Sequence, residues 1–341
     1  MFSPLFWVVC CYFFQSKTQK THDETEGSRM MAVKDPLRLK KAPLRKRIAS
    51  HWELYLFLIP AVIWYGIFRY GPLYGMQIAF RNFNGALGIW GSKWVGLKHF
   101  RTFFESYYFW PLLRNTLALS FYHLLASFPL PILLALMLNE MRVEKYRNVV
   151  QTVAYAPHFI SLVVLVGTVK IIFGTSTGLA SVLVGKLGIS YSNILTDPNA
   201  FRHVYVWSGI WQNVGWSAII YLASLSAIDP QQHEAAIIDG ASRLQRIWHI
   251  NLPVIVPVIT IMLILNSGSI MNIGFEKVLL LQNDLIMDTA DVISTYVYRR
   301  GLLHAEFSFS SAVDLFNNVC NFLLLIVVNY ISGRLNNNSL F

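Results

Sequence analysis

Long apolar stretches constrain the fold of this chain more than any other feature. A helix needs about 20 predominantly apolar residues to cross a bilayer. Six stretches meet that requirement, at residues 54–80, 111–138, 149–173, 203–226, 253–272 and 312–331. Hydrophobic residues make up 55% of the 341 residues and charged residues 13%, which is too apolar for a soluble domain of this size. We expect an all-α membrane protein with six transmembrane helices.

Basic residues near the span ends predict the side on which each loop lies, because cationic side chains are retained on the cytoplasmic face. Residues 34–47 are strongly basic and place the N-terminus in the cytoplasm. Alternation then places the loop with Arg142, Lys145 and Arg147, the loop with Arg243 and Arg246, and the C-terminus in the cytoplasm as well. The net charge of +10 therefore indicates topology, and no nucleic-acid partner is predicted.

The N-terminal segment and the cysteines carry little signal. Residues 2–14 are apolar, but about 13 residues are short for a span. We expect either a non-spanning extension or sequence upstream of a start at Met30 or Met31. Cys10, Cys11 and Cys320 have the spacing neither of a disulfide framework nor of a metal site.

The loop between the fourth and fifth spans contains signals for two short helices. Asp229-Pro230 is typical of a helix start, since Asp accepts an unpaired backbone N–H and Pro suits the first helical position. Gln232 follows at the spacing of a capping box. Asp239-Gly240 indicates a break, and Ser242 with Gln245 repeats the capping-box pattern.

The same loop contains apolar residues at helical spacing. Ile237, Ala241, Leu244 and Trp248 would form one apolar face if the two helices were roughly continuous. Periodicity alone leaves two interpretations: a helix that lies on the lipid surface, or a surface that binds another protein.

Residue identities in this loop resemble the signature of permease subunits in binding-protein-dependent ABC importers. That signature is E-A-A, three residues, G, nine residues, I-x-L-P, and the stretch EAAIIDGASRLQRIWHINLP from Glu234 to Pro253 matches it without a gap. From about residue 50 onward, WVGLKHFRTFF, RNTLALS, QTVAYAPHFIS, IDPQQHEAAIIDGAS and DVISTYVYRRGLL are similar to the branch that imports complex sugars. They resemble the permeases of bacterial alginate importers in particular. The first 30 residues or so depart from the family pattern.

This resemblance implies a type I ABC importer transmembrane fold with a cytoplasmic coupling helix, in the bacterial cytoplasmic (inner) membrane. A core of five helices would span 111–333, with the coupling loop at 228–251. Before it would come a cytoplasmic extension with the basic tract, 1–50, and then the first transmembrane helix with an external loop, 51–110. A cytoplasmic tail, 334–341, would follow.

In this family the coupling helix docks on a cytosolic ATPase, so that closure of two ATPases rocks the membrane helices. The resemblance thus implies ATPase-coupling roles for Glu234, Ala235, Ala236, Asp239, Gly240 and Arg243. Small alanines permit close approach, Glu234 can pair with a basic residue, and Gly240 lets the chain bend. The implied partners are a related second permease, two ATPase subunits and an extra-cytoplasmic solute-binding protein. ATP and Mg belong to the ATPases, since this chain lacks a G-x-x-x-x-G-K-[ST] phosphate loop and is expected to hold no cofactor or metal.

Polar residues within the fourth and fifth spans are candidates for the substrate pathway, because polar groups that face lipid are costly. Amides can bond sugar hydroxyls, and aromatic rings can pack on the apolar faces of sugars. The candidates are Trp207, Trp211, Gln212, Asn213, Asn266, Ser269 and Asn272. The alternative for each of them is packing between helices.

Four cations lie in or near the outer halves of spans: Arg69, Arg114, Lys170 and Arg202. They either snorkel to the lipid headgroups or bias the pathway toward acidic sugars such as those of alginate.

The sequence therefore favours one subunit of an ATP-driven importer of oligo- or polysaccharide, with no catalytic residues of its own. The alternative is a polytopic membrane enzyme or a self-contained secondary transporter. An enzyme would need a nucleophile with its base or a carboxylate pair at membrane depth, yet the acidic residues cluster in loops and no H-E-x-x-H occurs. The two halves of the chain are not visibly similar, as a transporter built from repeats would show.

Overall fold

The computed structural model describes residues 52–174, 178–186 and 193–336. The predictions for the N-terminal segment, the basic tract, Cys10 and Cys11, and the end of the C-terminal tail lie outside the described residues. The chain divides into two compact units, residues 1–68 and 69–341, and each is described by itself. The division predicted at residue 110 remains a prediction.

In the first unit, α3 (Trp52–Tyr65) is a helix with exposed apolar side chains. Phe57 is 83% exposed, as suits a surface that faces lipid. The ring of Trp64 contacts the ring of Tyr65 edge-on, with centroids 5.2 Å apart.

In the second unit the described residues form helices and one two-stranded sheet. The strands β1 (Arg81–Asn84) and β2 (Ser92–Trp94) are antiparallel, with Arg81 opposite Trp94. The helices before residue 175 are α4 (Gly88–Gly91), α5 (Lys98–Phe104), α6 (Phe109–Ser127), α7 (Pro129–Asn139), α8 (Glu144–Tyr155) and α9 (Leu162–Phe173). The later helices are α10 (Leu179–Lys186), α11 (Pro198–Leu225), α12 (Pro230–Ile238), α13 (Arg243–Arg246), α14 (Leu252–Ser267), α15 (Phe275–Leu281), α16 (Met287–Ala290), α17 (Ile293–Tyr298) and α18 (Phe307–Asn336).

Short 3-10 and π segments join these helices. The 3-10 segments are η2 (Gly71–Phe80), η3 (Ala156–Phe159), η4 (Ile194–Thr196) and η6 (Asp284–Ile286). The π segments are η1 (Gly66–Tyr70), η5 (Ile247–Asn251) and η7 (Arg299–Leu303).

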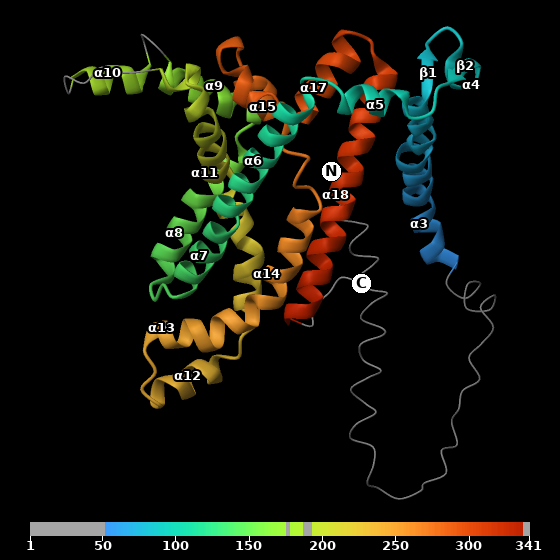
Figure 1. The fold of residues 1–341 in the computed structure, drawn as a ribbon. Coiled ribbons are helices and arrows are strands. Elements are labelled where there is room, and N and C mark those ends of the chain that lie inside the picture. Colours follow the sequence, from blue (N-terminus) through green and yellow to red (C-terminus); the bar gives the residue numbers. More distant parts are fainter. Residues whose placement is uncertain (1–51, 175–177, 187–192, 337–341) are drawn as a thin grey trace, which may run out of the picture. The chain divides into compact units, whose positions relative to one another are not determined.

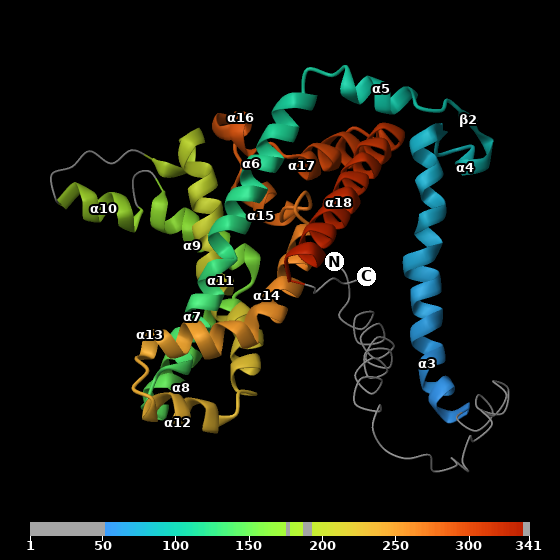
Figure 2. The same cartoon turned by 60° about the horizontal axis from the view of Figure 1, so that its bottom comes forward.

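Helix α11 packs against α6, α7, α8 and α14 (Figures 1 and 2). Helices α12 and α13 lie at one end of this bundle, at the bottom of Figure 1, and α15, α16 and α17 lie toward the other. A buried cluster at the α12–α13 end joins α7, α11 and α14 through Ala135, Ala218, Tyr221 and Ile255. These three helices are therefore joined at the α12–α13 end, and α18 packs in turn on α14 and α17.

Four helical stretches of the described chain are long and apolar enough to cross a membrane. They are Tyr55–Phe80, Phe109–Asn139, Arg243–Ser267 and Phe307–Arg334. A bent pair of helices, Glu144–Phe159 and Leu162–Phe173, makes a fifth if it counts as one span. Helix α11 has 28 residues, or about 42 Å at 1.5 Å per residue, and it contains the predicted fourth span. The predicted all-α membrane fold is confirmed.

The predicted third span, 149–173, is not one continuous helix. Its two halves meet at an angle of 98°. Pro157 lacks an N–H and disfavours helix in the residue before it, and the hydroxyl of Ser161 then caps α9 by accepting from the N–H of Val164 at 3.4 Å. The motif APHFIS therefore contains both the stop and the restart.

Helix α11 fixes this bend in place. The side-chain amide of Gln212 donates to the carbonyl of Ile160 at 2.8 Å, within the break. Beside it, Gly215 allows close approach, since a Cβ there would clash with the carbonyl oxygen of Ala154 in α8. The bend is therefore held by both a side-chain bond and a backbone contact.

Candidate functional site

The coupling loop, residues 229–253, forms two helices as predicted. Asp229 caps α12 by accepting from the N–H of Gln231 at 3.0 Å. Ser242 and Gln245 form the predicted capping box of α13, with bonds of 2.7 and 3.4 Å. The predicted starts of both helices are therefore confirmed, whereas the capping box predicted for α12 with Gln232 does not form.

The turn between these helices requires Gly240. Its φ is +78°, a left-handed backbone conformation that residues other than Gly and Asn rarely adopt. The N–H of Ala241 donates to the carbonyl of Ala236 at 2.8 Å, and the N–H of Gly240 to that of Ile237 at 3.0 Å. This pair of bonds is the Schellman motif, which ends α12 and sets the direction of α13.

The apolar face predicted to run across both helices does not form, because of this turn. Ile237, Ala241, Leu244 and Trp248 would line up only on a continuous helix, and the left-handed turn at Gly240 breaks the period. Leu244 and Trp248 instead line a groove with α7, whereas Ile237 and its neighbour Ile238 are 56% and 85% exposed on α12.

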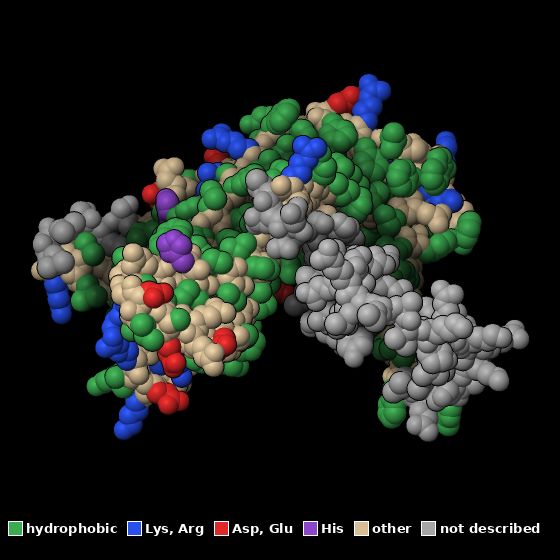
Figure 3. Space-filling view, turned by 90° about the horizontal axis from the view of Figure 1, so that it is seen from below, with side chains coloured by type: hydrophobic (Ala, Val, Ile, Leu, Met, Phe, Trp, Pro, Cys, Tyr) green, Lys and Arg blue, Asp and Glu red, His purple; other side chains and the backbone are tan. Residues whose placement is uncertain are grey.

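The predicted coupling residues lie together on the surface of this loop. Glu234, Ala235, Asp239, Gly240 and Arg243 are exposed, and Ala236 is half-buried. Within the described part of the chain, the carboxylate of Glu234 forms no hydrogen bond or ion pair. In Figure 3, which views the molecule from below, charged and hydrophobic side chains mingle over the end that carries α12 and α13. This mixed surface can bind a protein that offers both basic and apolar groups.

One charged contact fastens the loop to the membrane helices. The carboxylate of Glu140, directly after α7, lies 3.8 Å from the guanidinium of Arg246 and accepts from the amide of Asn251 at 3.2 Å. Asn251 is fully buried, and it is the variable position of the I-x-L-P motif. The loop is therefore bound to the end of α7 as well as to α14.

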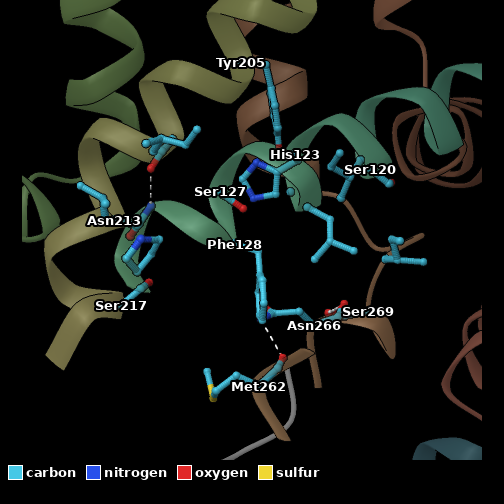
Figure 4. Close-up of a pocket in the computed structure, with 18 of the residues that line it drawn as sticks. Ser120, His123, Ser127, Phe128, Tyr205, Asn213, Ser217, Met262, Asn266 and Ser269 are labelled. Carbon is cyan, nitrogen blue, oxygen red and sulfur yellow. Dashed lines mark hydrogen bonds between the residues drawn. The ribbon is translucent and has the colours of Figure 1, made fainter. Parts of the chain in front are cut away.

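A second candidate site is a cavity of about 340 Å³ between α6, α7, α11 and the end of α14 (Figure 4). It is surrounded by His123 and Ser127 on α6, Asn213 and Ser217 on α11, Asn266 in the last turn of α14, and Ser269 just after that helix. Its other lining residues are Ser120, Leu124, Phe128, Pro131, Tyr205, Gly209, Ile210, Val214, Tyr221, Met262, Ile270, Asn272, Ile273 and Gly274. The lining contains hydroxyls, amides, an imidazole and aromatic rings, but no carboxylate among these described residues.

Two polar atoms of this cavity have no hydrogen-bond partner among the described residues: the hydroxyl of Ser120 and Nδ1 of His123. Ser120 is only 3% exposed. Because a buried polar group without a partner is costly, these atoms are suited to bonding a ligand or water inside the cavity.

Four of the predicted pathway residues line the cavity: Asn213, Asn266, Ser269 and Asn272. The amide nitrogens of Asn213 and Asn266 donate to carbonyls of their own helices, at 3.1 and 2.9 Å. Asn272 accepts from Asn317 at 2.7 Å. Each Asn thus has a bond within the protein and remains exposed on another side.

The other three predicted pathway residues lie elsewhere. Trp207 and Trp211 are 53% and 52% exposed, and neither lines the cavity. The indole of Trp207 donates to the hydroxyl of Tyr122 at 3.0 Å. Gln212 is buried against the bend between α8 and α9, so it packs between helices, which was the alternative interpretation.

A buried ammonium stands behind the cavity wall. Lys277 is 6% exposed, and its Nζ donates to the carbonyl of Tyr205 at 2.7 Å and lies 4.7 Å from the ring of Tyr205. Gly209 makes room for it, because a Cβ at Gly209 would lie 2.9 Å from Nζ. Lys277 lies in α15, outside the helices that are long and apolar enough to span a membrane, and burial lowers its pKa to about 8. No ion pair involves this ammonium in the described part of the chain.

None of the four cations singled out in the spans lines the cavity. Arg202 donates to the side-chain oxygen of Asn115 at 3.2 Å, and the side-chain amide of Asn115 donates in turn to the backbone carbonyl of Asp288 at 2.7 Å. Arg202 therefore supports packing between α6, α11 and α16. The described residues contain no cluster of three or more His, Cys, Asp or Glu that could hold a metal ion.

Sequence reasoning missed the contribution of α6 to the cavity. Ser120, His123 and Ser127 are spaced three and four residues apart within an apolar helix, so they share one face. That polar stripe was a usable signal, of the same kind that identified Asn266 and Ser269. Tyr205 and Ser217 on α11 were also missed.

Comparisons with known proteins place this geometry in a family. The model of the family described as binding-protein-dependent transport system inner membrane component matches residues 127–336. Protein LplB of Bacillus subtilis (strain 168) is 42% identical over 288 residues, which cover 84% of this chain and 91% of LplB. The polygalacturonan/rhamnogalacturonan transport system permease protein YteP of the same organism is 41% identical over 295 residues, covering 86% of this chain and 92% of YteP.

Solved structures agree with the family match. A crystal structure of a bacterial ABC transporter involved in the import of the acidic polysaccharide alginate contains a chain with 41% identity and a TM-score of 0.80, and the match covers 86% of this chain and 99% of that one. A second structure of an alginate ABC transporter, in complex with an alginate pentasaccharide-bound periplasmic protein, matches with 40% identity, a TM-score of 0.80, and coverage of 87% and 99%. This chain therefore belongs to the family of binding-protein-dependent transport system inner membrane components, the permease subunits of ABC transporters.

Proposed function

We propose that this permease forms part of an ATP-driven importer that carries an acidic oligo- or polysaccharide across the bacterial cytoplasmic membrane. Residues 229–253 couple it to a separate ATPase. Its partners are a second, related permease, two ATPase subunits that hold ATP and Mg, and an extra-cytoplasmic binding protein that delivers the sugar. Both termini lie in the cytoplasm.

The observation that carries the proposal is the cavity between α6, α11 and α14. Its amides and hydroxyls come from three helices and converge on one space, which is how proteins fix the orientation of a polar ligand. The free hydroxyl of Ser120 and the free Nδ1 of His123 offer hydrogen bonds that a sugar hydroxyl can take. YteP and the alginate transporter are named for polysaccharides, which supports a substrate of this class.

Charge around the cavity supports an acidic sugar. The lining has no carboxylate, and the ammonium of Lys277 stands directly behind Gly209 and Tyr205 with no acid paired to it in the described chain. A cation buried without a counter-charge is costly, and an anionic substrate would offset that cost. The polygalacturonan named for YteP and the alginate named for the solved transporter are both acidic.

Geometry of the loop supports coupling through α12. Its exposed carboxylate at Glu234 can form a charge-assisted bond, and Ala235 lets a partner approach closely. The Schellman turn at Gly240 and the contact of Glu140 with Arg246 and Asn251 make α12 part of a firmly held unit.

Transport by the reconstituted complex tests the proposal. Vesicles that contain both permeases and the ATPases, with the binding protein outside, are supplied with uronate oligosaccharides or neutral ones of the same length. Uptake and stimulated ATP hydrolysis should be specific to the uronates, and Lys277→Met should weaken uronate uptake about ten-fold while leaving any neutral uptake unchanged. Equal transport of both sugars by the unmodified complex would contradict the acidic assignment, and absence of uptake for the whole panel would contradict the sugar assignment.

A further inference from the structure

A groove of about 1020 Å³ lies where the membrane helices meet the coupling loop. One wall comes from α7 and the residues after it, and the other from α13, η5 and the start of α14. The floor is apolar, with Ile132, Leu133, Leu136, Met137, Ile247 and Leu252. The groove belongs neither to the cavity nor to the exposed face of α12.

The charges in this groove are unequally matched. Of its three charged lining residues, one is the acid Glu140, and its carboxylate contacts Arg246, which lies beside the groove. The two remaining cations that line it, Arg142 and Arg243, are exposed and form no ion pair or hydrogen bond in the described part of the chain. An apolar floor thus carries an unbalanced positive rim.

Two aromatic residues of the groove have the character of a membrane interface. Tyr146 is 67% exposed and Trp248 is 64% exposed, and each offers an apolar ring with one polar group. Such residues are enriched where the hydrocarbon core meets the headgroups. Their position agrees, since Phe109–Asn139 ends at the groove and Arg243–Ser267 begins there, and both stretches are long enough to span the membrane.

We propose that this groove binds one anionic phospholipid of the adjacent leaflet. An acyl chain lies along Leu133, Leu136 and Met137, and the phosphate pairs with the guanidinium groups of Arg142 and Arg243. Arg243, which the family resemblance places in ATPase coupling, then faces a headgroup. This site is independent of the sugar that the permease carries.

Lipid binding to the purified complex, with its partner permease and ATPases, tests this site. Phosphatidylglycerol and phosphatidylcholine with identical acyl chains are titrated in detergent, and bound lipids are counted by native mass spectrometry. The unmodified complex should prefer phosphatidylglycerol. Since a basic residue near a membrane surface contributes about 1 kcal/mol, Arg142→Gln with Arg243→Gln should reduce that preference about thirty-fold.

The matched control removes two cations outside the groove, Lys145→Gln with Arg101→Gln, and should keep the preference. Met137→Trp, which fills the groove, should weaken the binding of both lipids. A phosphatidylglycerol with a photoreactive acyl chain should label residues 129–146 or 243–252. The proposal is overturned if the double arginine variant keeps the preference for phosphatidylglycerol or if labelling falls elsewhere. It is also overturned if residues 129–146 or 243–252 are labelled only after the ATPases are removed, because a partner protein would then cover the groove in the complex.

Discussion

The coupling loop and the cavity are built in opposite ways. The loop is one contiguous segment whose conformation follows from local bonds: an Asp cap, a Schellman turn and a capping box. Its chemical groups point outward. The cavity collects single side chains from four helices that are distant in sequence, and its groups point inward.

Because they are built differently, the two sites should respond differently to substitution. Under the proposed function, a change in the loop should alter one contact surface with the ATPase and leave the membrane helices intact. A change in the cavity should alter the interior of the bundle and affect the sugar alone.

The largest contrast is expected in the accessibility of introduced cysteines to an impermeant reagent, because the proposed topology puts α12 inside the cell and Asp284 outside. In a background with its native cysteines replaced by Ser, Gln231→Cys should be fully protected from an impermeant thiol reagent in intact cells. Asp284→Cys should react, since Asp284 is exposed. Permeabilised cells, in which both should react, provide the control, and the reverse pattern would invert the whole topology.

Charge reversal on α12 should have the next largest effect. Glu234→Lys places a cation opposite the basic residue that the ATPase is proposed to present, and juxtaposed like charges are strongly unfavourable. Sugar-stimulated ATP hydrolysis and uptake should fall at least about a hundred-fold, and the ATPase should be lost from an affinity-purified complex. Glu105→Lys, which breaks an exposed ion pair with Arg101 far from the loop, is the control. Full retention of the ATPase by the Glu234 variant would refute the coupling role.

Substitution of Gly240 should separate backbone conformation from close approach. Gly240→Val is strained at a φ of +78° and should reduce coupled ATP hydrolysis about ten-fold. Gly240→Asn tolerates this conformation and meets no atom of this chain within 4 Å, so it should preserve coupling if the turn alone matters. A loss in the Asn variant as large as that in the Val variant would instead indicate that the ATPase surface touches the glycine.

Removing the free polar groups of the cavity should produce a smaller, sugar-specific effect. Because each hydrogen bond contributes about 0.5 kcal/mol at the low end of the usual range, Ser120→Ala combined with His123→Phe should lower sugar uptake about five-fold while basal ATP hydrolysis and assembly persist. Ser224→Ala is the matched control, since that hydroxyl on α11 bonds the carbonyl of Ile220 and does not line the cavity. Equal uptake by the double variant and the control would remove these groups from the pathway.

The smallest effect belongs to the exposed tryptophans. Trp207→Phe loses a hydrogen bond to Tyr122, and Trp211→Phe removes no bond in the described chain. Both should change the uptake rate less than about two-fold, since neither lines the cavity. A strong, sugar-dependent loss in either variant would return the tryptophans to the pathway.

Sequence predicted the loop well because its signals are local. Asp229, Gly240, Ser242 and Gln245 act on backbone groups within a few residues, so their spacing alone fixes the geometry. The bend at residues 156–161 was missed, although Pro157 and Ser161 mark it, because continuous hydrophobicity through 149–173 suggested a single span.

The cavity was predicted only in part because its formation depends on packing between helices. Asn266 and Ser269 were recognised as costly in lipid, but nothing local distinguishes Asn213, which lines the cavity, from its neighbour Gln212, which bonds Ile160. Lys277 was not considered, because only the packing of α15 on α11 reveals that its ammonium is buried.

The contact of Glu140 with Arg246 and Asn251 has a mechanical consequence. Helix α7 is fastened at that end to the coupling loop, and near its other end Pro131 and the adjoining Phe128 form part of the cavity wall. Under the proposed function, a displacement of α12 by an ATPase would therefore reach the cavity wall through α7, in addition to the covalent links of the loop to α11 and α14. Glu140 would then set how much of that movement α7 passes on to the cavity.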